Sequence, residues 1–168
     1  VTPSYENNGI ICAGNAETFT IVVNPSPEME NVDDFVLCNN EISSIIEFTT
    51  PNTDGNTTYT WTNDNTSIGL SSSGNGDIPS FTAINLNPIT EVATITVTPT
   101  YENNGVVCIG DPQTFSISVL SEIEISGSTV DALDCNDPNS GNINITVTGG
   151  SGVYDFLWSN GAITEDLN

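Results

Sequence analysis

The first 23 residues of the chain return, slightly altered, 96 positions later. Residues 1–23 (VTPSYENNGIICAGNAETFTIVV) and 97–119 (VTPTYENNGVVCIGDPQTFSISV) are identical at 14 positions, and other pairs exchange Ser for Thr or Ile for Val. A period of this length suits one β-sandwich module. We therefore predict that residues 1–27 are the C-terminal part of a preceding module and that residues 28–120 form one complete module. A different β domain is predicted to occupy residues 121–168.

β-branched and aromatic residues recur at strand-like spacing, and no window of the 168 residues resembles an amphipathic helix. The predicted fold class is all-β, with tandem immunoglobulin-like β-sandwich modules in a linear array. Within the complete module we predict strands at 42–49, 57–62, 92–98 and 114–119, turns at 51–56 and 103–105, and a long exposed loop at 63–79. The first two strands are expected to form a hairpin. Phe115, Ile117 and Val119 share one strand face, which is predicted to face the core.

Charge excludes several function classes. The chain has 22 Asp and Glu and no Lys, Arg or His, which gives a formal net charge of −22. Binding to DNA, RNA or anionic lipid needs cationic side chains, so no nucleic-acid partner is expected. General bases and oxyanion clamps of the usual kinds are missing as well. The adjacent acids Asp33 and Asp34 point to opposite faces of an extended segment, so we predict no catalytic residues and no enzyme activity.

Four cysteines without a Cys-x-x-Cys pair point to an oxidising compartment. They allow three pairings, and the repeat selects among them. Cys12 is the equivalent of Cys108, and the equivalent of Cys38 in the preceding copy would lie before residue 1. A Cys38–Cys108 disulfide is therefore predicted, with a stabilisation of about 4 kcal/mol. Cys12 and Cys135 are expected either to have partners outside this segment or to be free thiols.

Acidic residues crowd at the predicted module joints and raise the question of calcium, which binds oxygen ligands. They are Glu28, Glu30, Asp33 and Asp34 at the first joint, and Glu122, Glu124, Asp131, Asp134 and Asp137 at the second. Asp131, Asp134 and Asp137 are the candidate Ca²⁺ ligands, although no window fits an EF-hand loop. The alternative is a solvated acidic joint without a metal, and no other cofactor is predicted.

Trp61 and Trp158 each follow an aromatic residue on an alternating strand. Such pairs form stacking platforms for carbohydrate or pack inside a sandwich core. We predict that both tryptophans are structural core residues and that Trp61 packs on the predicted disulfide.

Two segments carry a family resemblance. Residues 28–120, with NVDDFVLCNN, TYTWTNDNTSIGLSSSGNGDIPSFTAIN and ATITVTPTYENNGVVCIGDPQTFSISV, resemble the PKD-like, immunoglobulin-type repeats of very large secreted surface proteins of the Bacteroidota. Residues 142–168 (NINITVTGGSGVYDFLWSNGAITEDLN) resemble the SprB repeat, in which a strand and a Thr-Gly-Gly-x-Gly turn precede an aromatic strand with Leu-Trp-Ser-Asn-Gly. The resemblance implies a SprB-like gliding-motility adhesin, exported by type IX secretion and associated with the outer membrane at the cell surface. It supplies no catalytic residues.

The function predicted from these features is a force-bearing, disulfide-stapled stalk in gliding and adhesion. Residues 24–27 and 120–121 are expected to be short linkers between its modules. The expected partners are neighbouring modules, an extracellular surface or polysaccharide reached through other parts of the parent protein, and the secretion and gliding machinery. The alternative is an accessory carbohydrate-binding module of a secreted polysaccharide-degrading enzyme.

Overall fold

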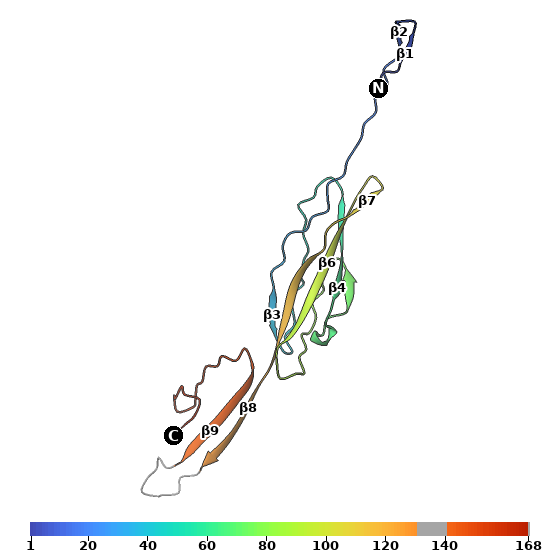
Figure 1. Cartoon of the computed structure of the whole chain (residues 1–168). Coiled ribbons are helices and arrows are strands. Elements are labelled where there is room, and N and C mark those ends of the chain that lie inside the picture. The colour runs from blue at the N-terminus through green and yellow to red at the C-terminus, as the bar shows by residue number, and fades with distance from the viewer. Residues whose placement is uncertain (131–140, 168) are drawn as a thin grey trace.

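The alternating segments of the sequence form two separate β-sheets in a computed structural model that describes residues 1–130 and 141–167. Figure 1 shows the parts strung along one line, with a small hairpin at the N-terminal end and the last strand pair toward the other. In chain order the elements are β1 (Ser4–Asn7), β2 (Ile10–Ala13), β3 (Phe35–Cys38), β4 (Asn56–Asn63), the 3-10 helix η1 (Thr66–Ile68), β5 (Ser73–Asn75), β6 (Glu91–Asn103), β7 (Val106–Ile109), β8 (Gln113–Val130) and β9 (Asn142–Gly150). The predicted all-β class is confirmed.

The larger sheet has the order β3-β8-β6-β4-β5, with β7 paired to β6 and β9 paired to β8. Strands β4, β6 and β8 are antiparallel neighbours, and Glu91 at the start of β6 lies opposite Val119 of β8. Strand β3 runs parallel to β8, with Phe35 opposite Ile117 and Cys38 opposite Leu120. The two strands nearest the ends of the predicted module therefore lie side by side.

One face of this sheet builds the core, because alternate residues of a strand point to the same face. The prediction for Phe115, Ile117 and Val119 is confirmed, since all three are buried. Tyr59 and Trp61 of β4 are buried on the same face, and the Tyr59 ring lies 5.4 Å from that of Phe48. The core is closed by side chains from outside the regular strands, namely Met29, Ile46, Phe48, Ile68, Leu70, Ile78 and Ala83.

The layer opposite the sheet is irregular, which corrects two predictions. Segment 42–49 forms isolated bridges, Ile42 with Thr82 and Ile46 with Ile78, and makes no hairpin with β4. Both edges of β4 are already occupied, by β5 and β6. Segment 63–79 is mostly exposed, as predicted, but it is not a single loop, since it contains η1 and β5 and buries Ile68. The segment is polar on average, but its few large apolar residues pack into the core.

The sequence repeat is also a repeat of conformation. In the β1–β2 pair, Ser4 lies opposite Ala13 and Asn7 lies opposite Ile10. In the β6–β7 pair, Thr100 lies opposite Ile109 and Asn103 lies opposite Val106. The two pairs therefore have the same register, 96 residues apart. The turn residues Asn8 and Gly9 have φ values of 48° and 79°, and Asn104 and Gly105 have 51° and 78°. A two-residue hairpin turn of type I′ requires positive φ at both positions. The Asn-Gly pair therefore fixes the same hairpin twice.

Strand β8 passes through the predicted joint at residues 120–121 without a break. Its first part pairs with β3 and β6, and its second part pairs with β9, from Glu124–Thr148 to Val130–Asn142. A register shift between Ser121 and Glu124 marks the change of partner. The expected linker is therefore part of a strand, while the division into domains at this point stays a prediction. No helix in the described part of the chain has the length or apolar character needed to cross a membrane.

Candidate functional site at the β8 joint

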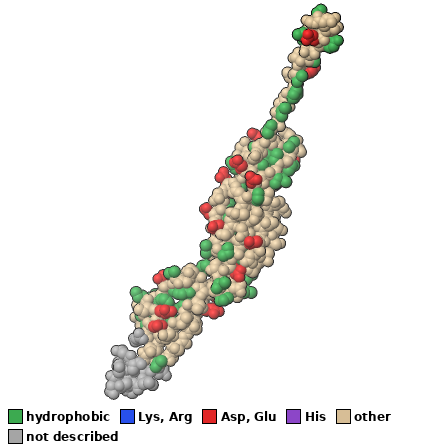
Figure 2. Space-filling view, viewed as in Figure 1, with side chains coloured by type: hydrophobic (Ala, Val, Ile, Leu, Met, Phe, Trp, Pro, Cys, Tyr) green, Lys and Arg blue, Asp and Glu red, His purple; other side chains and the backbone are tan. Residues whose placement is uncertain are grey.

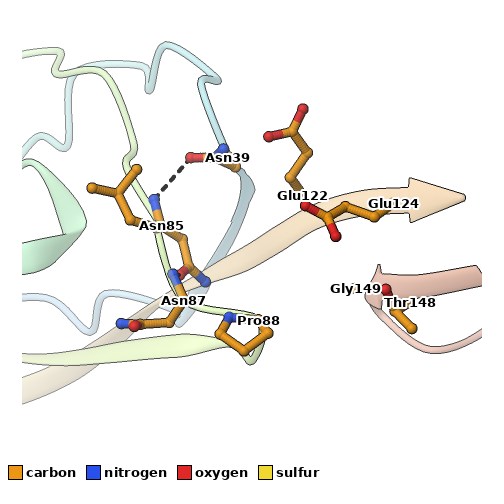
Figure 3. Close-up of a pocket in the computed structure, with 9 residues that line it drawn as sticks. Asn39, Asn85, Asn87, Pro88, Glu122, Glu124, Thr148 and Gly149 are labelled. Carbon is orange, nitrogen blue, oxygen red and sulfur yellow. Dashed lines mark hydrogen bonds between the residues drawn. The ribbon is translucent and has the colours of Figure 1, made fainter. Parts of the chain in front are cut away.

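A cavity of about 300 Å³ lies where β8 leaves the larger sheet and begins to pair with β9. Segment 85–88 and Asn39 form one side, and β8 and β9 contribute the other (Figure 3). The lining residues are Asn39, Asn85, Leu86, Asn87, Pro88, Glu122, Glu124, Thr148 and Gly149. This cavity is the strongest candidate for a functional site in the described residues, because it joins residues from both predicted domains.

Asn85 holds the sheet side of the cavity in place. Its side-chain amide donates to the carbonyls of Ile89 and Val119, each at 2.8 Å, and its Oδ1 accepts from the backbone N–H of Asn87 at 2.8 Å. Its own backbone N–H donates to Oδ1 of Asn39 at 2.8 Å (Figure 3). Asn85 is buried, and buried polar groups need partners of this kind. Its role is therefore structural, and the sequence does not single it out because Asn is abundant throughout the chain.

Glu122 and Glu124 are the acidic residues of the cavity. They lie two residues apart on β8, both are exposed, and both project from the strand across the cavity from Asn85 and Asn87 (Figure 3). Two carboxylates with nearby amide oxygens provide the donor type that Ca²⁺ prefers, but too few charged ligands for a well-formed site. Within residues 1–130 and 141–167, no group of three or more His, Cys, Asp or Glu side chains is placed to hold a metal. The predicted ligands Asp131, Asp134 and Asp137 lie outside the described residues.

Two other acids have structural partners near this end of the sheet. Glu91 accepts hydrogen bonds from the side chains of Asn65, Asn87 and Ser67, and these bonds lower the pKa of its carboxyl, those from Asn65 and Asn87 most. Asp34 accepts from the backbone N–H of Ser116 at 2.7 Å, and this bond lowers the pKa of Asp34. Both carboxylates therefore stabilise backbone or side-chain geometry through these hydrogen bonds.

The predicted Cys38–Cys108 disulfide is wrong for this structure. Cys12, Cys38 and Cys108 are all free thiols. Cys38 lies opposite Leu120, beside the start of β6, whereas Cys108 lies opposite Tyr101, ten residues further along β6 from Glu91. At about 3.3 Å per residue the two cysteines are separated by roughly 33 Å, and a disulfide needs Cα atoms within about 7 Å. Figure 1 shows β3 and β7 at opposite ends of the sheet.

The tryptophans have different environments. Trp61 is buried in the core, as predicted, but it packs over Gly74, its partner on β5, and not on a disulfide. Trp158 is half-buried outside that core, and its Nε1 donates to the carbonyl of Thr164 at 2.7 Å. Neither side chain forms an exposed platform.

The backbone conformation of the turn at residues 148–152 requires its glycines. Gly149, Gly150 and Gly152 have φ values of 86°, 59° and 77°, a region that side chains disfavour. A Cβ at Gly149 would also overlap the carbonyl oxygen of Glu122 in the neighbouring strand. The glycines therefore permit β9 to approach the irregular part of β8 and then turn away.

Comparison with protein families gives one match, to the SprB repeat at residues 127–163. Comparison with curated proteins and with solved structures gives no significant match. The PKD-like resemblance of residues 28–120 stays a prediction. The matched segment contains all of β9 and the glycine turn that borders the cavity, so the chain contains a SprB repeat that is joined to the larger sheet through β8.

Proposed function

We propose that this chain is a spacer segment of a large secreted adhesin at a bacterial cell surface, where it transmits force during gliding and adhesion. The SprB repeat at residues 127–163 is the observation that carries this proposal, since it suggests a SprB-like adhesin segment. The chain acts by its length and its resistance to unfolding, and it has no catalytic activity. Its partners are the neighbouring modules of the same adhesin and, through them, the secretion and gliding machinery.

The route of tension through the chain supports this role. Strand β8 is continuous from Gln113 to Val130, so force entering the SprB repeat passes along one strand into the sheet. Strand β3 lies beside it in parallel. Pulling β3 from its N-terminal end and β8 from its C-terminal end slides the two strands in opposite directions. The hydrogen bonds between them are then loaded in shear. All of them bear the force at the same time, so the pair does not open one bond after another.

The chemistry of the surface supports a spacer more than an enzyme or a sugar-binding module. Acidic side chains are distributed along the chain in Figure 2, and the sequence has no basic residue. Like charges on successive modules repel at distances below about 10 Å and oppose collapse of the array. The tryptophans that would stack on a carbohydrate are buried or half-buried. Other parts of the parent protein would contact polysaccharide.

Surface location is tested on intact cells of the bacterium that encodes the chain. An antibody raised against residues 1–168 should label unbroken cells, and brief external protease treatment should remove the label. Disruption of the gene should reduce gliding and adhesion. Labelling only after permeabilisation would contradict the proposal, as would normal gliding and adhesion in the disrupted strain.

The load-bearing role is tested by pulling the purified chain from its two ends. Residues 28–120 should extend in one main event that releases about 300 Å of chain, at about 3.3–3.6 Å per residue. Because Cys38 and Cys108 are free, reductant should not change this length. Ser118 lies opposite Val36 of β3, and its N–H faces β3 as that of Ser116 does. Ser118→Pro should therefore lower the rupture force.

The control is Thr58→Pro in β4, a strand that is not pulled directly and that pairs with β6. Forces are compared at denaturant concentrations that give both variants equal equilibrium stability. Ser118→Pro should rupture at a clearly lower force than Thr58→Pro. Equal rupture forces would show that the β3–β8 pair is not the load-bearing element.

A further inference from the structure

Segment Glu17–Val23 has the sequence of a core strand, but beyond Glu17 it pairs with no strand among the residues that the structure describes. Its counterparts at the repeat offset are Gln113–Val119, the first part of β8. Phe115 is 5% exposed, and Ile117 and Val119 are fully buried. Their counterparts Phe19, Ile21 and Val23 are 71%, 75% and 84% exposed. Figure 2 shows hydrophobic side chains along this thin part of the chain, next to the N-terminal hairpin.

One residue pair at the start of the segment is nevertheless bonded in the way that β6 and β8 pair 96 residues later. The amino group of Val1 donates to the carbonyl of Glu17 at 2.7 Å, and the N–H of Glu17 donates to the carbonyl of Val1 at 2.9 Å. Their counterparts Val97 and Gln113 are paired in the β6–β8 ladder. The N–H of Gly14 donates to the carbonyl of Pro3 at 2.8 Å, as that of Gly110 does to Pro99 at 2.9 Å. Residues 1–17 therefore hold segment 17–23 in the direction that β8 takes.

We infer that Glu17–Val23 is a β8-type strand that inserts between two strands of a preceding copy of this module. One neighbour is a β6-type strand that leads into Val1 and runs antiparallel, with Val23 opposite the equivalent of Glu91. The other is a β3-type strand that runs parallel, with Ile21 opposite the equivalent of Phe35. These registers follow from the pairing of β8 with β6 and β3 at the same offset.

The apolar face of the strand specifies the partner further. Phe19, Ile21 and Val23 point to one face because they alternate along the segment. In the complete module, the equivalent face packs against core residues such as Ile46 and Phe48. The partner must therefore supply a full core as well as two strand edges. This inference depends on the internal repeat and on the pairing of β8, and it is independent of the adhesin proposal.

The test supplies the missing strands by fusing a second copy of residues 28–96 ahead of Val1 in the full chain. The fusion keeps the natural connection, because residue 96 precedes Val97, the counterpart of Val1. Hydrogen–deuterium exchange is measured for the amides of residues 17–23. In the 168-residue chain they should exchange rapidly. In the fused chain they should be protected at least about 1,000-fold, as the amides of Gln113–Val119 are in the same molecule.

Two variants test the face assignment within the fused chain. Ile21→Asp places a charge on the apolar face and should abolish the protection of residues 17–23, while residues 113–119 remain protected. Thr18→Asp adds the same charge at the counterpart of exposed Thr114 and should leave the protection in place. In the unfused chain neither variant should change exchange at residues 17–23.

Three results would overturn the inference. The first is rapid exchange of residues 17–23 in the fused chain while residues 113–119 are protected. The second is protection that survives Ile21→Asp. The third is concentration-dependent protection in the unfused chain, which would assign the strand to a second molecule. None of these results depends on whether the protein is found at a cell surface.

Discussion

The hydroxyl of Tyr101 donates a hydrogen bond to the backbone carbonyl of Thr53 at 2.8 Å, and so ties β6 to the turn that precedes β4. Tyr101 is 1% exposed, whereas its repeat counterpart Tyr5 is 68% exposed. The two tyrosines occupy the same position of the same hairpin. Their environments differ because the strands that cover Tyr101 have no equivalent around Tyr5 in this structure.

This pair gives a matched test of the module. Tyr101→Phe should lower the free energy of unfolding by about 1 kcal/mol, because it removes one buried hydrogen bond and leaves the Thr53 carbonyl without that donor. Tyr5→Phe makes the same chemical change at an exposed position and should leave stability unchanged. Urea unfolding followed by circular dichroism measures both. Equal effects of the two variants would contradict the burial of Tyr101.

Gly74 makes room for the ring of Trp61. A Cβ at Gly74 would overlap the indole, because the two residues are partners in the β4–β5 pair. Gly74→Ala should therefore destabilise the module by about 1–3 kcal/mol through overpacking, and should change the fluorescence of Trp61. Ser73→Ala, at an exposed neighbouring position, is the control. A Gly74→Ala variant with the stability of the control would show that Trp61 does not pack over β5.

The described cysteines should behave as free thiols. Cys38→Ser and Cys108→Ser should each change stability by less than about 0.5 kcal/mol, because neither removes a cross-link. Peptide mapping without reductant should recover no peptide that joins Cys38 to Cys108. Recovery of that linked peptide from freshly purified protein, together with a stability loss of several kcal/mol in both serine variants, would contradict the positions of β3 and β7.

Acid should destabilise the module through Asp34 and Glu91. Hydrogen bonds lower the pKa of each carboxyl in the folded protein, so their stabilisation is present above the unfolded pKa values and is lost as pH falls through the folded ones. Stability should therefore decline below about pH 4. Asp34→Asn keeps an acceptor for the Ser116 N–H but cannot titrate, so its unfolding midpoint should depend less on pH below that value. Asp54→Asn, at an exposed position, is the control. Equal pH profiles for the two variants would show that Asp34 does not contribute to the loss of stability in acid.

Gly149→Ala should disrupt the SprB-repeat hairpin and leave the larger sheet folded. Gly149 has a φ of 86°, and a side chain there would overlap the Glu122 carbonyl. Exchange of the β9 amides should accelerate at least about tenfold, while exchange of the β4 and β6 amides should not change. Ser151→Ala, in the same turn, should have no effect. Faster exchange throughout the sheet would show that the two parts unfold as one unit.

The sequence by itself determined the β class, the repeat and the hairpins that the repeat contains. These are local properties. The Asn104-Gly105 pair has the positive φ values of a two-residue turn, and alternation alone places Phe115, Ile117 and Val119 on one face. The turn at residues 149–152 is implied by the resemblance to the SprB repeat, and its three glycines have positive φ values as well. Neighbours in the chain decide each of these features, so a single sequence is enough to predict them.

Only the tertiary structure decided which distant segments meet. The repeat offset gave Cys38 and Cys108 as a pair, but the parallel pairing of β3 with β8 places Cys38 at one end of the sheet and β7 places Cys108 at the other. The sequence of segment 42–49 predicts a strand that pairs with β4. Both edges of β4 are occupied by β5 and β6, and the segment instead forms isolated bridges on the side of the core opposite the sheet. The buried role of Asn85 depends on carbonyls contributed by Ile89 and Val119. Such contacts depend on strand order and register, which local propensity does not encode.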